Sequence, residues 1–324
     1  MDPLSQAAFG AAAAQACSRK KYYALAITMG ALGGLAPDLD VLIRSDTNPL
    51  MGILYHRHFT HSLAFIPVGA FLVAAGVWLL THLWQKLFKI SDRNIPPFKR
   101  MYLFSLIGYA THGFVDALTS YGTVLFWPFT DMRISWDWVS IIDPLVTFPL
   151  MIGIWLSYRR MKPAPLMVSI AFVGAYIGFL AMWHSRAETV YAEELQKNNV
   201  VAENLRVMPL LFKPLHYRAV FKSPELNEIV IANITTKLTG EVDITPAGTA
   251  PYISAEALLS QYPELKDSIH TYAWFTDDFM GVYSEEPLVI GDYRYGSFDT
   301  PLKPLWAIEF DKATRTISRI SMRR

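Results

Sequence analysis

The chain has 324 residues, of which 52% are hydrophobic and 18% are charged, so it is too apolar for an ordinary soluble protein and long enough for two domains. The formal net charge is +1 and no basic patch with interleaved aromatic residues occurs, so nothing argues for a polyanion-binding surface and nucleic acid is not the expected partner. The single cysteine, Cys17, excludes an intramolecular disulfide and a cysteine-based zinc cluster.

Several apolar segments have the length of membrane helices. A bilayer core of roughly 30 Å needs about 20 apolar residues in a helix. Residues 62–81 and 163–183 meet this length without a charge. Three further apolar segments are shorter: residues 22–37, 101–115 and 144–158. Each is long enough to cross the membrane if the adjoining segment, which contains an aspartate, is buried in protein. Residues 3–17 are predicted to form a short helix or partial span, with Asp2 as its N-cap and Pro3 at its first position.

The polarity of the chain changes near His184. Charged residues are scarce and clustered before it, whereas polar and apolar residues alternate after it. We therefore predict an α-helical polytopic membrane domain of five or six membrane helices over residues 1–184 and a soluble α+β domain over residues 185–324. In the second domain we expect helices at 185–198 and 254–266, a strand at 226–237, and a hairpin of residues 305–310 and 314–322.

The basic residues indicate an orientation in the membrane. Lysine and arginine gather at residues 19–21, 86–100 and 159–162, and the positive-inside rule places these stretches in the cytoplasm. The second domain is then expected on the opposite side, periplasmic or otherwise extracytoplasmic.

Ionisable side chains in or beside membrane helices are costly unless they are paired or coordinated, so they are candidates for function. The chain contains a set of them in four short motifs: Asp38, Asp40, His56, His61, His112, Asp116 and Asp143.

His112 and Asp116 lie four positions apart in an otherwise uncharged helical stretch, so both side chains face the same way. This spacing suits two ligands of one metal ion or of adjacent ions. Asp38 and Asp40 follow Pro37 at the end of a predicted helix, where two carboxylates repel each other unless a positive charge lies between them. A metal ion provides that charge; the alternative is a solvated turn in which an aspartate caps the next segment.

Three histidines occur within six residues, at positions 56, 58 and 61. His58 and His61 share a helical face, whereas His56 and His61 can meet only across a bend or a helix start, which Thr60 could cap. Arg57 can hold a phosphate or carboxylate in a bidentate contact, or orient Asp38 or Asp40 as a counter-ion.

Nitrogen and oxygen ligands without thiolates suit zinc, manganese or iron, and this combination is typical of zinc hydrolases. We predict one or two divalent metal ions, most simply zinc with manganese as an alternative, that activate water and clamp a phosphoryl or carbonyl oxygen. The predicted metal ligands are Asp38, Asp40, His56, His61, His112 and Asp116, and the predicted catalytic residues are Asp38, Asp116 and Arg57. The identity of the general base stays open. Structural roles are expected for His82, His184, His216 and His270.

The order of these motifs resembles that of the inner-membrane metal-dependent hydrolases of the YdjM type. The motifs that carry the resemblance are Asp2-Pro3-Leu4-Ser5-Gln6-Ala7, Pro37-Asp38-Leu39-Asp40, His56-Arg57-His58-Phe59-Thr60-His61-Ser62, His112-Gly113-Phe114-Val115-Asp116 and Asp143-Pro144. They span about residues 1–160, and the C-terminal domain is similar to the extension of longer members.

The resemblance implies a multi-pass protein of the bacterial inner membrane. It also implies a distant similarity to zinc phospholipase C, and hence phosphoester hydrolysis with a membrane lipid or another amphiphile as substrate. Many members have histidine at the position of Gln6, which puts one metal ligand in doubt, and many have glycine at the position of His58. The resemblance therefore implies that His56 and His61, rather than His58, are ligands.

Two other functions use the same residues. A cation or proton transporter also places Asp and His side chains inside the membrane. The few predicted spans, the absence of an internal repeat, and the grouping of the ligands near one membrane face argue against it. The third possibility is a scaffold in which a metal ion only fixes the helices.

Overall fold

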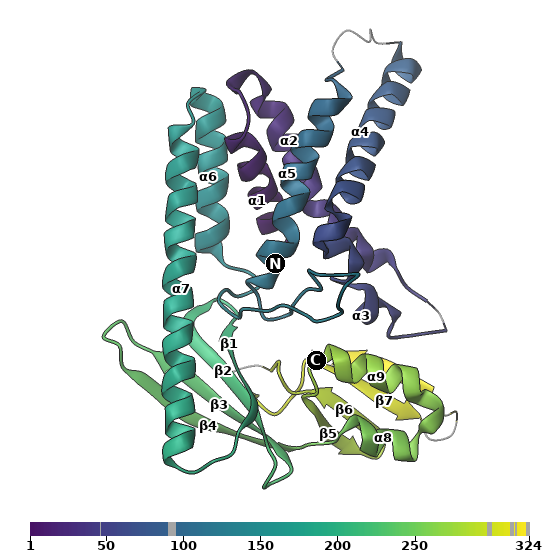
Figure 1. Ribbon diagram of the computed structural model, residues 1–324, viewed down its shortest axis with the longest axis vertical. Coiled ribbons are helices and arrows are strands. Elements are labelled where there is room, and N and C mark those ends of the chain that lie inside the picture. Colours follow the sequence, from purple (N-terminus) through teal and green to yellow (C-terminus); the bar gives the residue numbers. More distant parts are fainter. Residues whose placement is uncertain (46, 90–94, 297–299, 312–313, 315, 322–324) are drawn as a thin grey trace. The chain divides into compact units, whose positions relative to one another are not determined.

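The computed structural model of the protein describes residues 1–45, 47–89, 95–296, 300–311, 314 and 316–321 (Figure 1). The chain divides into two compact units. Unit 1 comprises Met1–Leu42 and Tyr55–Ala181, and unit 2 comprises Ile43–Leu54 and Met182–Arg324.

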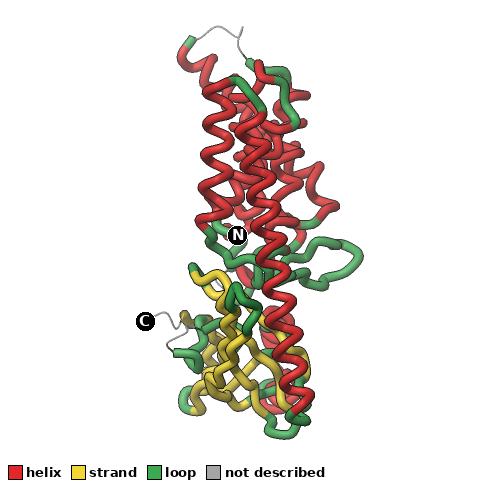
Figure 2. Tube along the Cα trace, turned by 90° about the vertical axis from the view of Figure 1, so that its left-hand side faces the viewer, coloured by secondary structure: helices red, strands yellow, loops and turns green. Residues whose placement is uncertain are grey.

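Unit 1 is helical, as the red tubes of Figure 2 show. Its helices are α1 (Pro3–Ala16), α2 (Tyr23–Leu35), α4 (Ile66–Phe88), α5 (Phe98–Ala117), α6 (Pro144–Arg160) and the first half of α7 (Ala164–Lys197). The short 3-10 helices η1 (Lys20–Tyr22), η2 (Ala36–Leu42), η3 (Phe59–His61) and η4 (Leu63–Phe65) precede or follow them, and α3 (Met51–Tyr55) lies almost entirely in the segment that belongs to unit 2.

Three stretches of the described residues are long and apolar enough to cross a membrane: Lys20–Leu42, Leu63–Phe88 and Ala164–Lys197. The predicted segments 101–115 and 144–158 do form helices, α5 and α6. They do not meet the same criterion, because α5 carries Lys99, Arg100, His112 and Asp116 and α6 has 17 residues. The five or six membrane helices therefore stay a prediction.

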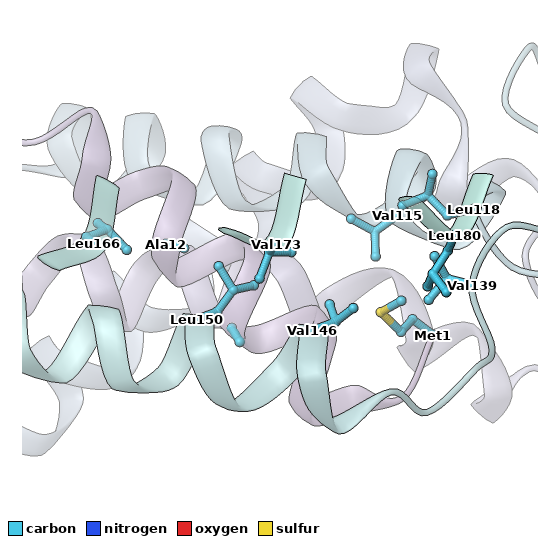
Figure 3. Packing of buried hydrophobic residues seen from close by; sticks show 11 residues of the cluster. Met1, Ala12, Val115, Leu118, Val139, Val146, Leu150, Leu166, Val173 and Leu180 are labelled. Carbon is cyan, nitrogen blue, oxygen red and sulfur yellow. The ribbon is translucent and has the colours of Figure 1, made fainter. Parts of the chain in front are cut away.

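The start of α1 follows the sequence signal. The Asp2 carboxylate accepts hydrogen bonds from the backbone N–H groups of Leu4 and Ser5, and Pro3 opens the helix, so the predicted cap is confirmed. One apolar core joins α1, α5, α6 and α7, and the Met1 side chain belongs to it together with Val139 and Val146 (Figure 3). This packing holds the start of the chain inside unit 1.

Glycines bring the backbones of α1, α2 and α5 into direct contact. A Cβ atom added to Gly108 of α5 would lie 2.1 Å from the carbonyl oxygen of Gly30 in α2, and one added to Gly10 of α1 would lie 2.2 Å from the same oxygen. A Cβ on Gly33 would lie 2.4 Å from the carbonyl oxygen of Ser105. The C-terminal half of α2, which leads into Asp38, is thereby held against the helix that carries His112 and Asp116.

Unit 2 contains two antiparallel sheets with sequential strand order (Figure 1). The first has β1 (Glu203–Leu210), β2 (Lys213–Ser223), β3 (Glu228–Thr236) and β4 (Val242–Pro251), and packs against the second half of α7 through Ala187 and Tyr191. The second has β5 (Met280–Glu285), β6 (Leu288–Asp292), β7 (Trp306–Asp311) and β8 (Thr316–Ser321). Between the sheets in sequence lie α8 (Ala255–Gln261), η6 (Pro263–Leu265) and α9 (Lys266–Phe275).

The predictions for the second domain were incomplete. The strand at 226–237 is β3, and the hairpin is β7 with β8, although Lys312 and Ala313 of its predicted turn lie outside the described residues. Residues 185–198 are not a separate helix but largely the continuation of α7. The single helix at 254–266 is wrong, because Pro263 lacks an N–H group and α8 ends at Gln261. The other strands were missed; one of them, β4, contains Pro246 and Gly248, which are atypical of strands.

We expect Gly108→Ala to destabilise unit 1. The new methyl group would meet backbone rather than a movable side chain, so we expect a loss of about 1–3 kcal/mol or more in the free energy of unfolding. Thermal unfolding of the full chain in detergent measures this. Gly76→Ala in α4 is the matched control, because nothing lies within 4 Å of its added Cβ. Equal stability of the two variants would contradict the close packing of α2 and α5.

Candidate metal centre

Three segments of unit 1 bring the candidate ligands together. The 3-10 helix η2 carries Asp38 and Asp40, the stretch up to η3 carries His56, Arg57 and His61, and α5 carries His112 and Asp116 one turn apart. Two groups result that could hold a metal ion, and they share Asp38: the first is Asp38, His61, His112 and Asp116, and the second is Asp38, Asp40 and His56.

In the first group, five of the six distances between ligand atoms are close to those of a tetrahedral site. The Nε2 atoms of His61 and His112 are 2.8 Å apart. Asp38 Oδ1 lies 3.5 Å from each of them, and Asp116 Oδ2 lies 3.4 Å and 3.5 Å from them. In a tetrahedral zinc site with bonds of about 2.0 Å, neighbouring ligand atoms are about 3.3 Å apart. The donor set, two imidazoles and two carboxylates, also suits zinc.

The hydrogen bonds of the two imidazoles fix which nitrogen faces inward with a lone pair. His112 Nδ1 lies 2.6 Å from the carbonyl oxygen of Gly34, which can only accept, so Nδ1 donates. The Thr60 hydroxyl donates its one proton to Asp40, so its contact of 3.0 Å with His61 Nδ1 requires that nitrogen to donate as well. In their neutral forms both rings therefore direct a lone pair at each other across 2.8 Å, an arrangement that needs a shared proton or a cation.

The carboxylates favour positive charge at this position. Burial by itself lowers the pKa of the His61 imidazole, but the three adjoining carboxylates outweigh burial and raise this pKa to about 10. A proton or a metal ion can supply the charge.

Asp116 is held by groups around the site. Its Oδ1 accepts a hydrogen bond from Gln6 Nε2 at 2.8 Å and pairs with the α-amino group of Met1. Its Oδ2 lies 3.1 Å from Arg57 Nε and accepts no hydrogen bond from the described residues. Asp116 thus has one oxygen engaged and the other directed at His61 and His112. Gln6 donates its amide N–H to the candidate ligand Asp116 and is not itself in either ligand group.

Asp40 contacts two of the histidines. Its Oδ1 lies 2.8 Å from His56 Nδ1, and its Oδ2 accepts from the backbone N–H of Arg57 and from the Thr60 hydroxyl, both at 2.9 Å. The same Oδ2 is 3.3 Å from His61 Nδ1. A carboxylate behind an inward-facing histidine is a common arrangement around metal ions, where it fixes the ring and raises its basicity.

The sequence suggested Arg57 as a counter-ion of Asp38 or Asp40, but its guanidinium pairs with neither of them. The guanidinium pairs with Asp116, donates from Nη1 to the Thr119 hydroxyl at 3.3 Å, and lies 4.6 Å from the centre of the Tyr121 ring. These contacts bury Arg57 and direct its charge at the cluster.

The remaining candidates lie elsewhere. Asp143 caps α6 by accepting from the backbone N–H of Leu145, and its other oxygen accepts from the Tyr176 hydroxyl. It therefore lies outside the cluster, although the sequence grouped it with the other ionisable residues. His58 contacts Asp131 at 3.5 Å and belongs to neither group. His82, His184 and His216 each lie within hydrogen-bond distance of a backbone carbonyl oxygen outside the cluster, those of Trp78, Val207 and Pro214 respectively. His270 belongs to neither group.

Sequence reasoning missed several supporting residues. Thr60 is not a helix cap, because Ser62 caps η4; Thr60 instead contacts Asp40 and His61. Gly113 allows the segment at His61 to approach α5, since an added Cβ would lie 2.4 Å from the His61 carbonyl oxygen. The position of Gly113 directly after His112 was the only signal in the sequence for this close approach.

Helices that can cross a membrane and a buried His/Asp group together define a membrane protein with a candidate metal-binding cluster. The chain belongs to the YdjM inner membrane protein family, whose family model matches residues 1–187. That range contains the whole cluster and confirms the resemblance of the motifs. The chain is also 26% identical over 152 residues to the uncharacterized protein YfhP of Bacillus subtilis (strain 168), a match that covers 46% of this chain and 42% of that protein. No solved structure matches the chain.

We expect His61→Ala and His112→Ala to lose bound metal. Each variant removes one of the two facing imidazoles, and detergent-purified protein can be assayed for zinc and manganese per chain by plasma mass spectrometry. His58→Ala is the matched control and should keep the metal content of the unmodified protein, because His58 lies outside both groups. Full metal content in His112→Ala would remove the assignment.

Asp40→Asn tests whether Asp40 orients ligands or binds metal itself. Loss of an orienting partner typically weakens metal affinity by about 10–100-fold, and the number of ions bound at saturating zinc should stay the same. A competing chelator dye measures affinity, and Asp131→Asn, with its side chain 71% exposed beside His58, is the control. A lower number of bound ions at saturation would instead make Asp40 a ligand of a second ion.

Proposed function

We propose that the protein is a membrane-bound metal-dependent hydrolase that cleaves a phosphoester bond of a membrane lipid or another amphiphile. The observation that carries the proposal is the first ligand group, in which two imidazole nitrogens and two carboxylate oxygens converge at metal-binding distances. A divalent ion bound there would supply water activation near neutral pH and a positive charge for a phosphoryl oxygen.

The exposure of the ligands supports a reactive site over a closed structural one. The side chains of His61, His112 and Asp116 are fully buried, whereas Asp38 is 21% exposed and the neighbouring His56 is 23% exposed. Catalytic metal sites keep one position open for water or substrate, and structural sites are closed by four protein ligands. In this proposal the buried His61, His112 and Asp116 bind the ion, and the open position lies at the partly exposed Asp38. We assign the open side of the cluster to the face formed by Asp38 and His56.

The chain's own residues have distinct roles in this proposal. Asp116 is a ligand whose second oxygen is fixed by Gln6 and Met1, and Arg57 supplies a buried positive charge next to it. Arginine suits a phosphoryl group because of its planar, permanently charged guanidinium. Asp38, the partly exposed carboxylate, is placed to accept a proton from an attacking water or to remain a ligand.

The proposal predicts phosphodiesterase activity that depends on metal. We expect detergent-solubilised protein to hydrolyse bis(p-nitrophenyl) phosphate and phospholipids in mixed micelles, and we expect removal of metal by a chelator to lower turnover by about 100-fold or more, because the ion's charge stabilisation is lost. Added zinc or manganese should restore it. His112→Ala should be inactive, and His58→Ala should retain turnover.

Two negative results point to the other functions. Metal-loaded protein that hydrolyses no ester but carries zinc or protons into liposomes would make the cluster a transport site. Metal-loaded protein with neither activity, and with reduced thermal stability after chelation, would make the ion a structural brace for the helices.

A further inference from the structure

An apolar groove of about 410 Å³ lies in unit 1 between α1, α2 and α6. Its lining includes Ala7 and Ala11 of α1, Ala24 and Ala31 of α2, and Trp155 of α6. The alanines leave space because their side chains are short, and larger side chains of α6 form the opposite wall. The volume is within the range of small-molecule binding sites.

The surroundings of the groove identify what fills it. It is lined by α2, which belongs to a stretch long and apolar enough to cross a membrane. Its rim carries exposed apolar side chains, with Leu4 50% and Trp155 59% exposed. Around a membrane-spanning helix the medium is lipid hydrocarbon, where polar ligands lose their hydration without finding hydrogen bonds. An alkyl chain is therefore the occupant that the lining fits.

The groove runs along the helices toward the metal centre. Helices α1 and α2 are antiparallel neighbours, since Gly34 approaches the Gln6 backbone and Gly30 approaches Ala14. Leu4 and Ala31 thus mark one end of the groove, and Ala11 and Ala24 mark the other. Ala24 and Ala31 are seven residues apart, which corresponds to about 10 Å of helix.

The end at Leu4 and Ala31 is the end next to the cluster. Gly34, whose carbonyl oxygen accepts from His112, comes three residues after Ala31. Gln6, which contacts Asp116, comes two residues after Leu4. The same two helices therefore line the groove and hold the ligands of the metal centre.

We propose that this groove binds one alkyl chain of a membrane lipid, with the polar end of the lipid at Leu4 and Ala31. The placement of the polar end rests on the proposed hydrolase function, whereas binding of the alkyl chain does not. The groove then selects substrates with a long alkyl chain and holds them beside the metal centre.

Photolabelling tests the assignment without requiring turnover. The full chain is reconstituted in vesicles of phosphatidylethanolamine and phosphatidylglycerol that contain a phosphatidylethanolamine with a diazirine in one acyl chain. After irradiation, labelled residues are mapped by mass spectrometry. We expect labelling at Met151 and Trp155 to exceed that on the exposed face of α4, at Leu72 and Leu79, which reports ordinary contact with bulk lipid.

Variants that fill the groove provide the decisive comparison. Ala31→Trp, or Thr28→Trp at an exposed lining position, should reduce labelling at Met151 and Trp155 by about tenfold, which corresponds to roughly two methylene groups no longer buried. Leu32→Trp is the matched control, because Leu32 is on the same helix, 37% exposed and outside the lining. Equal labelling in the filled and control variants, or no excess over α4, would overturn the proposal.

The result is separable from the hydrolase proposal. His112→Ala, which should abolish hydrolysis, should still be labelled in the groove. Groove labelling in a protein with no hydrolase activity would support alkyl-chain binding alone. Hydrolysis of phospholipid that is unchanged by Ala31→Trp, together with unchanged labelling, would refute the groove and leave the hydrolase proposal in place.

Discussion

The candidate metal centre depends on two imidazole nitrogens, His61 Nε2 and His112 Nε2, that face each other at 2.8 Å inside a helical unit. Each ring is fixed from behind, by Gly34 in one case and by Thr60 with Asp40 in the other, so neither can turn its lone pair away without breaking a hydrogen bond. Buried lone pairs in this arrangement repel unless a cation or proton lies between them. The surrounding carboxylates bring two further ligand atoms to within 3.5 Å.

Backbone packing makes that convergence possible. The ligands come from segments far apart in sequence, and glycines at the contacts of α1, α2 and α5 let the three backbones approach to distances that no side chain would allow. The chain thereby places η2, which follows α2 and carries Asp38, against the α5 turn that carries His112 and Asp116. Another face of α1, with Ala7 and Ala11, forms part of the apolar groove, so small residues on this helix serve both the packing and the groove.

Unit 2 obeys different constraints. Its two antiparallel sheets bury ordinary apolar cores, and the fully buried Arg294 is neutralised by Asp292 and by Asp277. The candidate metal ligands all belong to unit 1, as does the groove, and the family match ends at residue 187. The proposed chemistry is therefore a property of unit 1.

The sequence by itself determined the features that depend on local chemistry. Uncharged runs predicted helices, Asp2 and Pro3 predicted the start of α1, and the spacing of His112 and Asp116 placed both on one helical face. The close set of histidines and aspartates indicated a metal site because charges are costly inside a membrane. Only the tertiary structure decided that Asp143 caps a helix, that Asp40 contacts His56 and His61, and that Thr60 and Met1 join the site. Those roles arise from contacts between residues distant in sequence, which local patterns of polarity and spacing do not encode.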